Sequence, residues 1–195
     1  MSAARRACRA PSLAACAILL ASCAAHPDRF YGLSTIPQTA RPGAAGFATR
    51  VLLSVSIPSL VDRRELIVDV PGDRILVLEH ERWAAPLSDL VSQTLARDIE
   101  QRRADVLVAD RAFDQAGVKP VRIKVDIVRM SARRGGPATL ESHWRIEDPA
   151  AQIDLLGGGS FSSPIEGEDY AAIARAFSLC LASLADRLVE KLPSR

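Results

Sequence analysis

The stretch KPVRIKVDIVRMSARRGGPATLESHWRIE, residues 119–147, decides the fold class. Apolar side chains occupy every second position of residues 121–127, with charged ones between them, and residues 139–147 repeat the alternation. A period of two sends side chains to opposite faces of a strand, so each half is predicted to be a strand with one buried and one solvated face. The Arg-Arg-Gly-Gly-Pro run at 133–137 supplies a turn. The stretch therefore predicts antiparallel strands over a single core.

Shorter apolar runs on both sides predict further strands. Residues 152–161 complete a three-stranded meander, loosened by Gly157, Gly158 and Gly159. Proline, glycine and aspartate at residues 71–73 predict a tight turn between two strands. The other predicted strands span residues 30–36, 50–57, 65–70, 74–79 and 105–109, with a loop at 39–46.

Two segments have helical periodicity. The first helix is predicted to begin at Pro86, with its apolar stripe at Leu87, Leu90, Val91, Leu95 and Ile99, and its polar residues, including Asp98 and Arg102, off that stripe. The second carries an apolar seam at Tyr170, Ile173, Phe177, Leu181, Leu184 and Leu188. The order of elements predicts an α+β fold: a two-layer sandwich in which two helices pack on one face of a mostly antiparallel sheet. Residues 30–192 are predicted to form one domain.

The N-terminus has the pattern of an export signal. Three arginines precede an apolar run at residues 13–21, which is too short for a permanent transmembrane helix. Leu20-Ala21-Ser22-Cys23 has the form of a bacterial lipobox, so cleavage is expected between Ser22 and Cys23, with diacylglycerol on the Cys23 sulfur and an acyl chain on its amino group. The alternative is a plain signal peptide with an accidental cysteine. Residues 1–22 are then the leader and residues 23–29 a lipidated tether.

Composition narrows the function once the leader is removed. Of 25 basic residues, three arginines leave with the leader, so 22 stand against 23 acidic ones and the net charge is −1. Such a balance gives no reason to expect nucleic acid binding. Cys180 is the one thiol left after lipidation of Cys23, so no intramolecular disulfide is expected.

Catalytic and metal-binding patterns are weak. Gly157-Gly158-Gly159-Ser160 lacks the second glycine of a nucleophile elbow, because Ser162 stands two residues after Ser160. Glu79-His80-Glu81 would alternate faces in an extended chain, which argues against a metal site. His26, His80 and His143 are expected to be ordinary solvated or edge histidines, and Cys180 a buried structural thiol. We therefore expect no catalytic residues, no metal, no cofactor beyond the lipid, and no enzyme activity.

Aromatic and basic residues supply candidates for binding a partner. Trp83 lies just before the first helix, where it could pack the helix entry onto the sheet or anchor a partner. The candidate partner-binding residues are Phe30, Tyr31, Arg82, Trp83, Pro86 and Leu87.

Several short motifs occur together in a fixed order along the chain. They are the lipobox, Phe30-Tyr31-x-Leu33, Ile57-Pro58-x-x-x-Asp62-Arg63 before Leu66-Ile67-Val68, Arg82-Trp83-Ala84-x-Pro86-Leu87, Trp144-Arg145-Ile146, and Asp169-Tyr170-Ala171-Ala172. In that order they resemble the ABC-type transport auxiliary lipoprotein family over roughly residues 22–190. Leu60-Val61 departs from the pattern, which has an aromatic residue followed by leucine there.

This resemblance implies a role without catalysis. Members of that family act beside MCE-domain proteins, which form hydrophobic conduits for lipid. The lipoprotein is thought to dock the far end of the conduit at the outer membrane, as an oligomeric ring. It implies a homo-oligomer, facing the periplasm, that supports envelope integrity. Ala24 after Cys23 favours the outer membrane by the sorting rule of enteric bacteria. The alternative is a lipoprotein that binds lipid itself, in a cavity between sheet and helices.

Overall fold

The computed structural model describes residues 27–38, 49–109 and 119–193 of the 195-residue chain. The predicted leader, Ser22, Cys23, His26 and the loop at 39–46 lie outside the described residues. The elements are β1 (Arg29–Tyr31), β2 (Thr49–Ser56), β3 (Glu65–Val70), β4 (Arg74–Trp83), α1 (Leu87–Arg102), β5 (Val106–Ala109), β6 (Val121–Ala132), β7 (Pro137–Asp148), β8 (Ile153–Pro164) and α2 (Tyr170–Val189).

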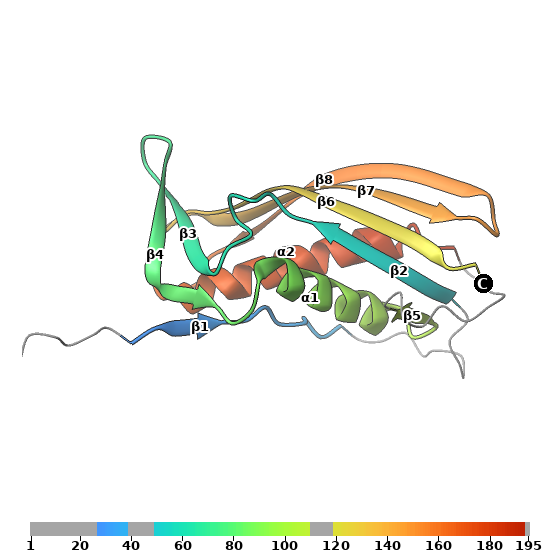
Figure 1. Cartoon of the computed structure of the whole chain (residues 1–195), viewed down its shortest axis with the longest axis horizontal. Coiled ribbons are helices and arrows are strands. Elements are labelled where there is room, and N and C mark those ends of the chain that lie inside the picture. The colour runs from blue at the N-terminus through green and yellow to red at the C-terminus, as the bar shows by residue number, and fades with distance from the viewer. Residues whose placement is uncertain (1–26, 39–48, 110–118, 194–195) are drawn as a thin grey trace, which may run out of the picture.

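The larger sheet has five strands in the order β5-β2-β6-β7-β8. Strands β6, β7 and β8 form the predicted antiparallel meander, and Trp144 stands opposite Val125 on one side and Gly157 on the other. The apolar set of β6 is buried under the helices, whereas its charged set is exposed. We call these the helix face (Val121, Ile123 and Val125) and the outer face (Arg122, Lys124 and Asp126). The α+β prediction is confirmed, with α1 packed over β2 and β5, and α2 over β7 and β8 (Figure 1).

The five-stranded sheet is mixed, because β2 is parallel to both of its neighbours, β5 and β6. Between β2 and β5 the chain passes through the β3–β4 hairpin and α1, which is the kind of long crossover that parallel neighbours require. The alternation of side chains predicted the strands, but it did not predict that β2 would pair in parallel with both neighbours.

A second sheet, β1-β4-β3, stands at one end of the molecule, where the β3–β4 hairpin projects across the long axis (Figure 1). Strand β4 continues past the predicted end at residue 79 to Trp83, because its second half pairs in parallel with β1. Strand β1 is shorter than the predicted 30–36, because helix side chains bind the backbone beyond it. The Ser34 N–H donates to Ser178 Oγ at 3.0 Å, and the Ile36 N–H to Asp98 Oδ1 at 3.2 Å.

Helix α2 confirms the predicted seam, with all of its members buried except the half-buried Tyr170. Its first turn is capped by Asp169, whose Oδ1 accepts the Ala172 N–H at 2.9 Å. A side-chain oxygen in this position satisfies one of the free N–H groups at a helix N-terminus.

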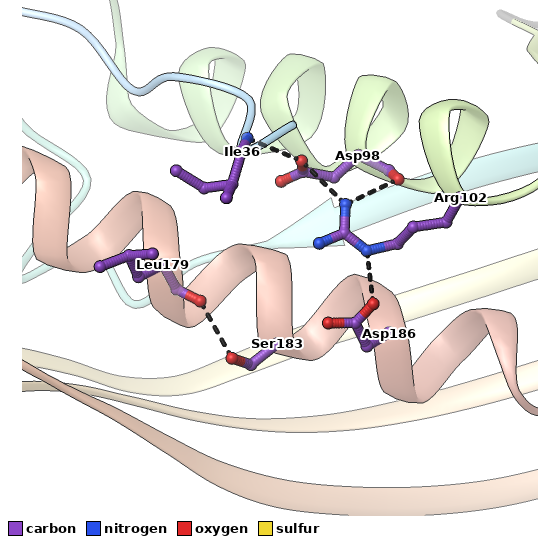
Figure 2. Close-up of polar contacts among 6 residues, drawn as sticks. All are labelled: Ile36, Asp98, Arg102, Leu179, Ser183 and Asp186. Carbon is purple, nitrogen blue, oxygen red and sulfur yellow. Dashed lines mark hydrogen bonds and ion pairs between the residues drawn. The ribbon is translucent and has the colours of Figure 1, made fainter. Parts of the chain in front are cut away.

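Part of the polar side of helix α1 is buried, although the position of the apolar stripe predicts that this side is exposed. Asp98 and Arg102 are buried, because α2 and the segment after β1 pack against them. Figure 2 shows Arg102 reaching from α1 to both acidic groups: Nη1 donates to Asp98 Oδ1 at 3.1 Å, and Nε donates to Asp186 Oδ1 of α2 at 2.6 Å. The guanidinium therefore ties the two helices together.

The three glycines of β8 introduce no bulge, because the pairing with β7 is in continuous register from Ile153 to Pro164. They make room for side chains of β7 instead. A Cβ at Gly157 would lie 2.4 Å from Trp144 Nε1, and one at Gly158 would lie 2.9 Å from His143 Cδ2. The predicted loosening is not seen in the pairing of the strand, and the glycines leave space that side chains of β7 occupy.

Candidate partner-binding site

The predicted partner-binding residues gather where β1 lies beside β4. Phe30 pairs in register with Arg82, and Tyr31 with Trp83. Phe30 is 61% exposed, an unusual state for a phenylalanine. The pairing therefore presents one aromatic side chain to solvent at the end of the three-stranded sheet.

Glu81 is held by two residues of β1. The Tyr31 hydroxyl donates to Glu81 Oε2 at 2.5 Å, and Arg29 Nη1 lies 3.3 Å from Glu81 Oε1. Partial burial and then the hydrogen bond to this carboxylate raise the pKa of Tyr31 to about 12. The phenol is therefore neutral at ordinary pH and acts as a hydrogen-bond donor.

Asp28 binds two side chains of β4 just before β1 begins. Its Oδ1 lies 3.1 Å from His80 Nδ1, and its Oδ2 lies 3.4 Å from Arg82 Nε. Sequence reasoning missed both Asp28 and Glu81 as parts of this site. The available signal was the alternation of acid and base at residues 79–82, beside the Asp-Arg pair at 28–29.

Trp83 and Leu87 point into the protein instead. The Trp83 side chain is only 4% exposed, and its ring lies 6.5 Å from that of Phe177 on α2, tilted by 55°. Leu87 is equally buried. This arrangement agrees with the packing role considered for Trp83, and it leaves Phe30, Arg82, Pro86 and half-buried Tyr31 as the members of the set that reach the surface.

Helix α1 begins at Leu87, one residue later than predicted, and Pro86 stands in the N-cap position. No side-chain cap comes from Pro86 itself, and Asp62 takes that part: its Oδ1 accepts the Ser88 N–H at 3.1 Å. The Asp62 carboxylate thus meets the positive end of α1, which gives the Asp-Arg motif before β3 a structural role.

The outer face of the five-stranded sheet has a shallow depression of about 510 Å³, lined by β2, β6, β7 and the exposed Leu156 of β8. Two of its basic side chains, Lys124 and Arg145, are ion-paired. Arg145 makes two hydrogen bonds to Asp154, at 2.8 and 2.6 Å, and lies 3.1 Å from Glu147. The bonds from Arg145 hold the pKa of Asp154 below its usual value. Such a paired surface resembles a solvated sheet face more than a reactive site.

The Cys180 thiol and the possible metal-binding side chains show no arrangement for catalysis in the part of the chain that the structure describes. Burial raises the pKa of Cys180 to about 11, and its Sγ lies 3.6 Å from the Ala138 carbonyl oxygen, which fits the expected structural thiol. Within residues 27–38, 49–109 and 119–193, no group of His, Cys, Asp and Glu side chains could hold a metal ion.

Where the two sheets meet the helices, there is little space for a lipid. The cavity among Trp83, Leu87, Met130 and Phe177 measures about 10 Å³, which is room for at most one water molecule. A lipid cavity would have to be too large for seam residues such as Phe177 and Leu181 to fill, and both of these side chains are buried. No helix among the described residues is long and apolar enough to cross a membrane.

Comparison with known proteins adds a family and a fold. The family model of the ABC-type transport auxiliary lipoprotein component matches residues 31–189. A crystal structure of an uncharacterized protein superposes with a TM-score of 0.67 at 11% identity, covering 85% of this chain and 99% of that one. A crystal structure of a Xanthomonas campestris protein of the DUF330 family gives 0.58 at 19% identity, covering 84% and 91%. No curated protein matches in sequence. At these identities the two structures show a shared fold.

Proposed function

Since the chain belongs to the family of ABC-type transport auxiliary lipoprotein components, we propose that it is a membrane-anchored adapter of a lipid-transport system. Its acylated Cys23 holds it in the outer membrane, facing the periplasm, where it docks an MCE-domain lipid conduit and supports envelope integrity. It acts without catalysis and as a homo-oligomer. The observation that carries the proposal is the family match over residues 31–189, preceded in the chain by a sequence of lipobox form at residues 20–23.

The tether limits where the adapter works. Six residue steps separate Cys23 from Arg29, the first residue of β1. At about 3.4 Å per residue they span at most ~20 Å, so β1 stays close to the acylated leaflet. Phe30 and Arg82 therefore face a partner near the membrane surface. Trp83 and Leu87 support this end of the protein from within the core.

Phe30 is the residue we assign to partner contact. Aromatic and arginine side chains contribute most of the free energy at many protein interfaces, and Phe30 beside Arg82 offers both. The pairing with β4 fixes the Phe30 backbone in advance, so little ordering entropy opposes binding.

The experiment replaces the gene by variants in its own organism. A Cys23→Ala protein carrying an ordinary cleavable signal should fold and be exported, yet fail to restore resistance to detergent. Full restoration by this unanchored form would refute the adapter model.

A second variant tests the contact surface. Phe30→Ala should remain anchored and folded but capture less of the MCE-domain protein after cross-linking in cells. Leu60→Ala is the matched control, since Leu60 is an apolar side chain of similar exposure, 56% against 61%, outside the β1–β4 pairing. Equal capture by the two variants would remove Phe30 from the interface.

A further inference from the structure

Three large apolar side chains are exposed where the β3–β4 hairpin meets the end of β6. Leu60 is 56% exposed, Ile75 45% and Val128 47%, and all three line one groove of about 200 Å³. We call these three residues the hairpin patch. They come from the loop before β3, from the start of β4 and from β6, so the fold brings together apolar groups that are distant in sequence. Exposed apolar side chains gathered in this way mark a surface that contacts a protein or a membrane.

Arginines surround the hairpin patch. Residues 60–76 and 128–134, which contain the patch, carry six arginines and four acidic residues, whereas the chain after the leader has a net charge of −1. Arg74 directly precedes Ile75, and Arg129 directly follows Val128 and lines the same groove. Arginine binds phosphate groups through its planar set of N–H donors, so this rim is suited to phosphates at the edge of an apolar layer.

The acidic residues at this end only partly offset the arginines. Asp62 binds the first turn of α1, and Glu65 Oε2 lies 3.0 Å from Arg63 Nε. Asp69 and Asp73 are the other two. The five arginines besides Arg63 make no ion pair among the described residues, so the surface around the groove is positively charged.

The lipid anchor enters at this same end. The hairpin and the start of β1 lie together at one end of the molecule (Figure 1). Strand β1 is parallel to β4, so its direction, followed backwards, leads along β4 toward the hairpin turn, and Asp28 Oδ1 still lies 3.1 Å from His80 Nδ1. Cys23 is five residues before Asp28, just as Ile75 is five residues before His80. At about 3.4 Å per residue both intervals are ~17 Å, so the acyl chains can reach the level of the hairpin patch.

We propose that the hairpin patch is a second membrane contact, in which Leu60, Ile75 and Val128 enter the headgroup region of an anionic phospholipid leaflet and the surrounding arginines bind lipid phosphates. The inference rests on the acyl anchor of the proposed function and assigns the surface that faces the leaflet. One lipid signal and one basic, apolar surface together hold a protein at a membrane more firmly than either does alone.

The contact is compatible with a ring of copies. A cyclic ring whose axis is perpendicular to the membrane presents the hairpin patch of every copy to the same leaflet, so weak contacts add up. The acyl chains keep each copy at the membrane even when one patch residue is changed. Leu60→Ala therefore remains a valid control for capture of the MCE-domain protein.

The test measures binding of the mature Cys23→Ala protein to sedimenting vesicles. One set contains phosphatidylglycerol and phosphatidylethanolamine in equal parts, and the other contains phosphatidylcholine alone. Without its acyl chains the protein should be half bound at on the order of 1 mM anionic lipid, which is weaker than a single myristoyl chain achieves. Binding to the neutral vesicles should be on the order of tenfold weaker, because the arginines lose their partners.

Two pairs of substitutions test the apolar part. Ile75→Thr/Val128→Thr keeps β-branched side chains in both strands and should weaken binding to the anionic vesicles about tenfold. Leu155→Thr/Leu156→Thr is the matched control, because these exposed leucines of β8 lie beside the opposite end of β6, and it should bind as the wild type does. Urea unfolding of each variant checks that the fold is kept.

Arg74→Gln/Arg129→Gln tests the charged part and should reduce binding to the anionic vesicles to nearly the level of the neutral ones. Equal binding by the Ile75/Val128 variant and its leucine control would overturn the proposal, and so would a wild type that stays unbound at 10 mM anionic lipid. Unchanged vesicle binding together with weaker self-association of the Ile75/Val128 variant would assign the patch to a second copy instead. These results leave the acyl anchor itself untouched, since complementation by Cys23→Ala tests it separately.

Discussion

Replacing Arg102 by methionine removes the cation between α1 and α2 while keeping most of the side-chain volume. Three hydrogen bonds disappear: to Asp186 Oδ1 at 2.6 Å, to the Asp98 carbonyl at 3.0 Å, and to Asp98 Oδ1 at 3.1 Å. Asp98 is fully buried, and its Oδ2 has no hydrogen-bond partner among the described residues. After the substitution, the Ile36 N–H is the remaining donor to its Oδ1.

The expected cost is about 3 kcal/mol of unfolding free energy. Removing one partner of a buried ion pair costs about 3–5 kcal/mol, because the other charge stays buried. The lower end applies here, since the Asp186 side chain is 42% exposed and water can replace its partner. For a protein of this size unfolding in urea with a slope of about 2 kcal/mol per molar, the midpoint should fall by about 1.5 M.

The cost should depend on pH in a defined direction. Burial raises the pKa of Asp98, although Arg102 acts to lower it. The folded protein therefore binds the Asp98 proton more tightly than the unfolded chain does, and the stability gained from that proton is lost as the pH rises through the folded pKa. Without Arg102 the pKa rises further. Arg102→Met should thus be more destabilising at pH 8 than at pH 5.

Urea unfolding followed by the fluorescence of the buried Trp83 and Trp144 measures both effects. Arg97→Met is the control, because Arg97 lies on the same helix and is exposed, so the change should be within about 0.5 kcal/mol. If Arg102→Met matched this control, or if it were more destabilising at pH 5, the ion pair would not hold the helices together as described.

Three further results are expected. Gly157→Ala should lower the free energy of unfolding by about 1–3 kcal/mol and change the near-ultraviolet circular dichroism of Trp144, because the new Cβ would lie 2.4 Å from its ring. Gly32→Ala is the control and should change neither quantity, because a Cβ there would have nothing within 4 Å. Similar values for the two variants would contradict the close contact between Gly157 and Trp144. Asp169→Ala should cost about 1 kcal/mol in urea unfolding by removing the cap of α2, and Asp169→Asn should restore most of it; equal losses would rule out the cap. Cys180, with its pKa raised to about 11, should react with a thiol reagent at pH 8 only as fast as the protein opens, and labelling at the rate of a free cysteine would show that it is not buried.

Alternation and helical spacing predicted the elements well, because they report which side of an element is buried. Residues 121–127 and 139–147 became adjacent strands with the predicted faces, and the seam of α2 became its buried side. The sequence pattern did not predict burial where a residue is covered by a different element. Asp98 and Arg102 lie off the apolar stripe of α1 and yet are buried, because α2 and the segment after β1 cover them.

The site was predictable in its parts and not in its arrangement. An Arg-Trp pair before a helix marked Arg82 and Trp83, but only the pairing of β1 with β4 shows that one reaches the surface while the other enters the core. The glycines of β8 predict a loosened strand, because the side chains that occupy the space beside Gly157 and Gly158, Trp144 and His143, belong to a different strand. A partner strand far along the chain leaves no local signal in either case.

Mass spectrometry of the protein isolated from its own membrane tests the central claim, that a lipid on one sulfur atom fixes a non-catalytic body to the envelope. The account predicts an N-terminal peptide that begins at Cys23 and carries both the diacylglycerol and the amide-linked acyl chain. An N-terminus at any other residue, or a Cys23 without lipid, would contradict it.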